Sequence, residues 1–82
     1  MTNIHNETEN PLSDLISDDV YDVLNQNGLI NHKSVRDYHI RKTFKKLRLT
    51  KISAGDAIDK IRSKYPYLQF DTIRKIVYQP QR

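Results

Sequence analysis

Apolar residues recur at helical spacing in four segments of the chain, and a capping or breaking residue borders each segment. In the first segment, Val20, Val23 and Leu24 follow this spacing and are expected to cover part of a core. Ser17 is a suitable N-cap for that helix, and Gly28 suits a left-handed stop at its end. The pattern therefore predicts a short first helix that ends before Gly28.

A longer helix is predicted from residue 32 to about residue 48, with Asn31 as its N-cap. Its apolar residues fall on two faces, one with Ile40, Phe44 and Leu47 and another with Val35 and Tyr38. We therefore expect this helix to pack on two sides.

Two shorter helices complete the pattern. Ser53 and Asp56 form a variant capping box, and Pro66 ends the helix that this box opens. The final helix is predicted from about Phe70 to Tyr78, and Pro80 prevents its continuation. The third helix directs four residues toward a core: Ala57, Ile58, Ile61 and Tyr65. With no strand-like alternation, the sequence predicts an all-α fold, a small three- to four-helix bundle.

Length and composition limit the function classes. A chain of 82 residues forms at most one small domain, for which we predict a disordered acidic tail at 1–12 and one helical domain at 13–80. There is no cysteine and no apolar run long enough to cross a bilayer, which favours a soluble cytoplasmic protein away from the membrane. His5, His32 and His39 lack ligand partners at metal spacing, so we expect surface histidines, no metal, no cofactor and no enzymatic activity.

Charge is divided sharply along the chain. Residues 33–82 contain all fourteen lysines and arginines against four acids, a pattern typical of proteins that bind phosphate. Residues 1–32 contain six acids and no lysine or arginine, and this acidic segment is a candidate site for a protein partner. The acids are Glu7, Glu9, Asp14, Asp18, Asp19 and Asp22.

The final helix is expected to be amphipathic, at about 100° per residue. Phe70, Ile73, Ile76 and Val77 share one side, and a polar face lies opposite. A short helix braced by the preceding one has the layout of a helix-turn-helix, here over residues 53–79. The residues predicted to face DNA bases are Thr72, Arg74, Lys75, Tyr78 and Gln79.

The last two predicted helices and the turn between them carry a pattern of aliphatic and basic residues with one tyrosine: Ile61, Lys64, Tyr65, Leu68, Ile73, Arg74 and Ile76. Through these residues the segment from Arg36 to Tyr78 resembles the C-terminal helix-turn-helix of small bacterial and phage transcription factors, including Mor-type activators and, more distantly, sigma factor region 4. The resemblance implies a DNA-binding transcription regulator. The chain departs from the family pattern at Arg62, where alanine is usual, at Pro66 and Tyr67, where a turn glycine is usual, and at Gln69, where a hydroxyl cap is usual.

Two function classes stay open. In the first, the protein binds double-stranded DNA, sequence-specifically or generally, with the base-facing set above and a second basic set on the DNA backbone. In the second, it is a protein-interaction adaptor whose basic face docks an acidic partner and whose final helix is merely structural. With neither partner, the charged helix faces are ordinary solvated surface. The DNA sequence, activation or repression, and the oligomeric state are left open. The predicted backbone-contacting residues are Arg41, Lys42, Lys45, Lys46, Arg48 and Lys51.

The acidic segment generates a first prediction. Its charge, tethered to the basic half, should compete with DNA phosphate. Neutralising Asp18, Asp19 and Asp22 to asparagine should therefore tighten binding to random duplex DNA, measured by fluorescence anisotropy. The gain should shrink as salt screens the attraction. Equal affinity of the two proteins at low and moderate salt would leave the segment with a purely structural role.

Overall fold

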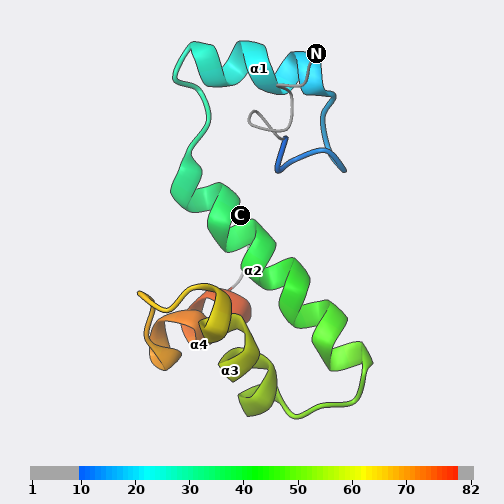
Figure 1. Cartoon of the computed structure of the whole chain (residues 1–82), viewed down its shortest axis with the longest axis vertical. Coiled ribbons are helices and arrows are strands. Elements are labelled where there is room, and N and C mark those ends of the chain that lie inside the picture. The colour runs from blue at the N-terminus through cyan, green and yellow to red at the C-terminus, as the bar shows by residue number, and fades with distance from the viewer. Residues whose placement is uncertain (1–9, 80–82) are drawn as a thin grey trace. The chain divides into compact units, whose positions relative to one another are not determined.

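The computed structural model describes residues 10–79, and all regular structure in this range is helical (Figure 1). The four helices are α1 (Asp18–Gln26), α2 (His32–Leu49), α3 (Ala54–Lys64) and α4 (Phe70–Tyr78). The predicted all-α class is thereby confirmed. The backbone contacts divide the chain into an N-terminal unit, residues 1–35, and a C-terminal unit, residues 36–82, and each is described by itself. Most of the predicted 1–12 tail, and the predicted break at Pro80, lie outside the described residues.

Both ends of α1 are closed as the sequence predicts. The Ser17 hydroxyl accepts a hydrogen bond from the Val20 N–H at 3.3 Å. At the other end, Gly28 has a φ of +69°, and its N–H donates to the Asn25 carbonyl while the Leu29 N–H donates to the Leu24 carbonyl. This pair of bonds is the Schellman arrangement, which satisfies carbonyls that the helix end would leave unpaired.

The buried face of α1 differs from the predicted one. Val20 and Val23 are 47% and 58% exposed, whereas Tyr21 is buried. Leu24, three residues after Tyr21, is half-buried. The prediction that Val20 and Val23 cover a core is therefore wrong, because helical spacing identifies an apolar stripe but the larger tyrosine ring, with more area to remove from water, occupies the covered side.

A turn precedes α1 and is fixed by one buried polar side chain. The Asn10 amide donates to the Ile16 carbonyl at 2.9 Å and to the Asp18 carboxylate at 3.1 Å, and its oxygen accepts from the Leu12 N–H at 2.8 Å. Asn10 is only 8% exposed, so these three bonds offset the cost of removing its amide from water.

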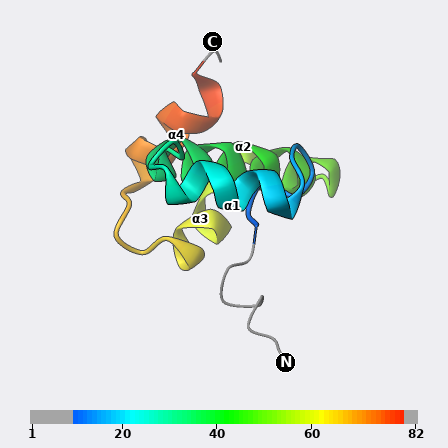
Figure 2. The same cartoon turned by 90° about the horizontal axis from the view of Figure 1, so that it is seen from above.

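The C-terminal unit is built on isoleucines contributed by three helices. In this unit α3 and α4 lie along the C-terminal half of α2, and in Figure 2 α3 and the end of α4 lie on opposite sides of it. The buried cluster is formed by Ile40 of α2, Ile58 and Ile61 of α3, and Ile73 and Ile76 of α4. Partly buried side chains pack around it: Phe44, Leu47, Tyr65, Leu68, Phe70 and Val77.

The connection from α3 to α4 is a tight turn. The Leu68 N–H donates to the Tyr65 carbonyl at 2.9 Å, with Pro66 as the second residue of the turn, where its fixed φ is favourable. The predicted cap of α3 is confirmed, since the Ser53 hydroxyl accepts from the Asp56 N–H at 3.1 Å. Gln69, at the N-cap of α4, makes no side-chain capping bond.

The α2–α3 connection contains a strained backbone position. Lys51 has a φ of +70°, and its N–H donates to the Arg48 carbonyl at 3.0 Å, so it ends α2 as a left-handed residue. This conformation costs a residue with a Cβ roughly 1–2 kcal/mol relative to its usual one, whereas glycine adopts it freely.

Ile73→Ala should destabilise the C-terminal unit by about 2–5 kcal/mol. The Ile73 side chain is 0% exposed at the meeting point of three helices, and the substitution removes most of its buried surface. Thermal unfolding measures the loss, and Thr72→Ala on the exposed side of α4 is the control. An unchanged unfolding temperature for Ile73→Ala would mean that α4 does not pack through this face.

Lys51→Gly should raise the free energy of unfolding by about 0.5–1 kcal/mol, because relief of the left-handed strain exceeds the entropy that glycine adds to the unfolded chain. Lys46→Gly is the matched control, since Lys46 lies within α2 and glycine there should cost about 1 kcal/mol. Chemical denaturation should thus give shifts of opposite sign. Shifts of the same sign would contradict the assigned backbone conformation of Lys51.

Candidate functional site

The helix α2 has a core face and a basic face. Ile40, Phe44 and Leu47 pack into or against the isoleucine cluster. Residues three and four positions apart lie together on a helix surface, so Arg41, Lys42 and Lys45 share a different side of α2. The core packing therefore fixes the direction in which these three cations project.

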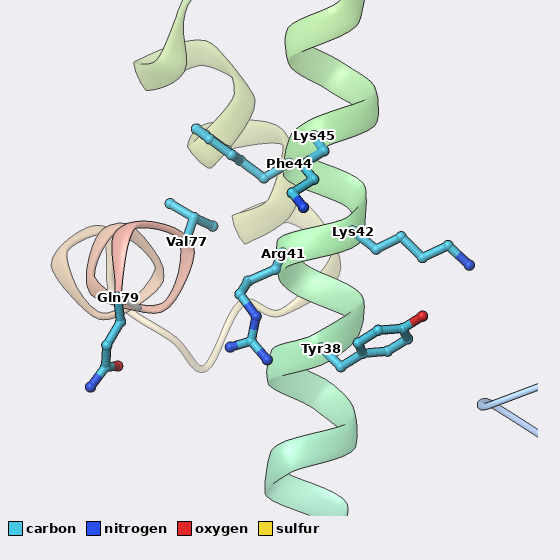
Figure 3. A pocket seen from close by; sticks show the side chains of 7 residues that line it. All are labelled: Tyr38, Arg41, Lys42, Phe44, Lys45, Val77 and Gln79. Carbon is cyan, nitrogen blue, oxygen red and sulfur yellow. The ribbon is translucent and has the colours of Figure 1, made fainter. Parts of the chain in front are cut away.

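A groove of about 390 Å³ lies between α2 and α4, and we call it the α2–α4 groove (Figure 3). Three of the six cations predicted to contact a DNA backbone line it, together with one residue from the predicted base-facing set. The apolar side chains of Phe44 and Val77 complete the groove between the two helices. Its lining residues are Tyr38, Arg41, Lys42, Phe44, Lys45, Val77 and Gln79.

A second, more open depression of about 360 Å³ lies on the outward side of α4, and we call it the α4 hollow. Four of the five predicted base-facing residues line it: Arg74, Lys75, Tyr78 and Gln79. The fifth, Thr72, is exposed on α4 but lines neither depression. Gln79 lines both, so the α2–α4 groove and the α4 hollow meet at this residue.

An aromatic contact joins α2 to α4 beside the two depressions. The rings of Phe44 and Tyr78 lie 5.7 Å apart between centroids, edge to face, and join α2 to the last turn of α4. Such a pair contributes roughly 0.5–1.5 kcal/mol beyond the area that it buries. Val77 also packs against the isoleucine cluster, so two successive residues anchor the end of α4.

Side chains in the α2–α4 groove point in two directions. In Figure 3, Arg41 extends from α2 in the direction in which Gln79 extends from α4, while the side chains of Tyr38 and Lys42 point away from α4. The Lys42 ammonium lies 6.0 Å from the centre of the Tyr38 ring, at the outer limit of a cation–π interaction. The Arg41 guanidinium and the Gln79 amide therefore extend in the same direction.

Several predicted residues lie elsewhere. Lys46, Arg48 and Lys51 line neither depression, and the Arg48 guanidinium donates to the Ile52 carbonyl at 3.3 Å. On α4, Arg74 lies 3.7 Å from the Asp71 carboxylate, with both side chains more than half exposed. Pairs of this kind contribute little to stability.

Sequence reasoning missed Tyr38, Phe44 and Val77 as lining residues of the groove. It assigned Phe44 and Val77 to the core, where they are partly buried and still form one wall of the depression. Tyr38 was detectable, because it precedes Arg41, Lys42 and Lys45 by three, four and seven residues, which is the spacing of a single helix stripe.

A separate polar cluster lies where the C-terminal unit begins. The Arg36 guanidinium donates twice to one oxygen of Asp37, at 3.0 and 2.9 Å. This bonding raises the pKa of Arg36, with burial opposing it and Tyr67 adding a smaller increase. Burial also raises the pKa of Tyr65, whose ring lies 6.3 Å from that of Tyr67. These groups connect α2 to the α3–α4 turn.

Within residues 10–79, no group of three or more histidine, cysteine, aspartate or glutamate side chains could hold a metal ion. In the same part of the chain, every helix is too short or too polar to span a membrane. The features that stand out in the C-terminal unit are therefore its two neighbouring depressions and the cations that line them.

No protein-family model, curated protein or solved structure matches this chain.

Proposed function

We propose that the protein binds double-stranded DNA through the α2–α4 groove and the α4 hollow and acts as a small transcription regulator. In this proposal α3 and α4 form a helix-turn-helix, with α4 facing the bases and α2 the phosphates. The supporting observation is that three of the six predicted backbone-contacting cations line one depression, four of the five predicted base-facing residues line its neighbour, and the two depressions share Gln79.

The charges of the two depressions favour the binding of a polyanion. Five basic side chains line them and neither is lined by an aspartate or glutamate. Asp71 lies near one edge of this surface but pairs with Arg74. Arginine and lysine clusters of this kind supply the salt-dependent part of DNA affinity by displacing counterions from phosphates. The five residues are Arg41, Lys42, Lys45, Arg74 and Lys75.

The packing of α4 leaves its polar side exposed, which suits a helix that contacts DNA bases. Ile73 and Ile76 are buried, whereas the intervening Arg74 and Lys75 are exposed. A nine-residue helix is marginal alone, so α3 and α2 must support it. The major groove of DNA admits one helix, and a braced helix with a polar outer face meets that requirement. The resemblance to Mor-type regulators supports a role in bacterial or phage transcription, which takes place in the cytoplasm.

A protein-interaction adaptor is the second candidate, and one observation favours it. Phe44 and Val77 contribute apolar surface to the α2–α4 groove, which a phosphate backbone does not need but an acidic amphipathic peptide would cover. The same cations would then pair with carboxylates.

Salt-dependent binding to duplex DNA separates the two candidates. If the three groove cations contact phosphate, affinity for a random duplex should fall by about 40-fold between about 50 and 200 mM salt, and by more if Lys75 and Arg74 also contact phosphate. Lys75→Ala and Arg74→Ala should each weaken binding by about 1–3 kcal/mol if they reach base edges. Arg41→Ala should weaken binding to all DNA sequences alike. It should also reduce the slope of log affinity against log salt concentration by about 1.

Lys60→Ala is the matched control, because Lys60 is exposed on α3 and lines neither depression. It should leave DNA affinity nearly unchanged, and thermal unfolding checks that each variant folds. Absence of binding at about 50 mM salt would contradict the DNA proposal and favour the adaptor. Equal losses for Lys60→Ala and Lys75→Ala would show that net charge, and not the α4 surface, governs binding.

A further inference from the structure

We infer that Gln79 determines sequence specificity by reading an adenine in the major groove, with Arg41 holding a neighbouring phosphate. This inference rests on the proposed DNA-binding function and deepens it. It assigns one base type to one side chain, which the predicted base-facing set does not do.

The first support is the position of Gln79. It is the residue common to the α2–α4 groove and the α4 hollow, so it has cations on both sides. It is exposed and follows the last residue of α4, with φ −77° and ψ +134°. This extended backbone releases its side chain from the helical direction, and Figure 3 shows the amide extending away from α4. A ligand lying across both depressions would pass this amide.

The second support is hydrogen-bonding capacity. A glutamine amide has two N–H donors and one carbonyl acceptor. Within residues 10–79, no hydrogen bond engages the Gln79 side chain. The cations around it offer donors only, so they cannot satisfy its N–H groups. An outside group that presents an acceptor beside a donor would satisfy both, and the N7 and N6 positions of adenine form that pair in the major groove.

The other members of the base-facing set are less suited to this role. Arg74 offers donors only, which suits guanine or phosphate, and Tyr78 presents a single hydroxyl on a ring that contacts Phe44. Thr72 lines neither depression. Lys75 is a flexible point charge, which suits guanine or phosphate and does not present the donor–acceptor pair that adenine requires.

Arg41 supplies the positioning contact. Its side chain extends from α2 in the same direction as that of Gln79 from α4, and both line the α2–α4 groove. A guanidinium binds phosphate through two parallel hydrogen bonds, which fixes orientation as well as adding affinity. A phosphate held there would set the register of the adjacent bases against Gln79.

The test is selection from a duplex library with a random central segment, followed by sequencing of the bound DNA. The wild-type protein should enrich a motif with an adenine that Gln79→Ala no longer selects, with discrimination at that position falling about tenfold or more. Gln79→Glu should move the preference there toward cytosine, whose N4 amino group donates to a carboxylate. The other positions of the motif should keep their preferences.

Gln69→Ala is the matched control, since Gln69 is also exposed but lies at the opposite end of α4 and makes no capping bond. It should retain the wild-type motif. Unchanged preferences in Gln79→Ala, or a uniform loss of affinity at all sequences, would overturn the inference and leave DNA binding intact. Enrichment of guanine where adenine is expected would also overturn it. A wild-type protein that binds no duplex at about 50 mM salt would overturn the proposed function itself.

Discussion

The packing of α4 through Ile73 and Ile76 is the interaction on which the rest of the C-terminal unit depends. A helix of nine residues is not stable in water without a covered face, because the free-energy cost of nucleation exceeds the stabilisation that so few backbone hydrogen bonds supply. The buried isoleucines of α2 and α3 supply that cover. Any function of the outer face of α4 therefore depends on side chains that no ligand touches.

The same packing gives α2 two roles. Ile40 faces the core while Arg41, the next residue, lines the groove, so the same turn of α2 contributes both to stability and to surface charge. The Phe44–Tyr78 contact then fixes the end of α4 against this helix. A polyanion bound across both helices would interact only with the folded arrangement and would stabilise it by mass action. Folding and binding are thus expected to be coupled in this unit, although different side chains carry them.

The sequence predicted helix ends better than it predicted helix faces, for a physical reason. Caps are local: Ser17, Ser53 and Gly28 act on backbone groups within a few residues, and each lies where the sequence predicts. Which side of a helix is covered depends on neighbours that sequence spacing does not reveal, as the exposure of Val20 and the burial of Tyr21 show. The α2–α4 groove was not predictable for the same reason, since it needs the relative positions of α2 and α4, whereas the residues that line the α4 hollow all come from α4 and its end and belong to one predicted set.

The left-handed turn at Lys51 was equally hidden from the sequence. The end of the helix near residue 48 was predicted, but a lysine, unlike a glycine, gives no signal that the chain turns through a left-handed residue there. The strain is held by local bonds, with the Lys51 N–H on the Arg48 carbonyl and the Thr50 hydroxyl on the Leu47 carbonyl at 2.6 Å. Local bonds can therefore override the intrinsic preference of a residue, as tertiary contacts do for the faces of helices.

The α3–α4 turn shows the opposite case, in which an unexpected residue fits without strain. The resemblance to helix-turn-helix proteins favours a glycine where this chain has Pro66 and Tyr67. No residue from 65 to 69 has a positive φ, so the conformational freedom of glycine is not needed in this turn. Proline instead fixes one dihedral angle, and Tyr65 and Leu68 pack against the isoleucine core on either side of it. The stiff backbone of the turn and its two apolar contacts thus add to the isoleucine packing that orients α4 relative to α3, and a glycine here would loosen the helix whose outer face carries the proposed function.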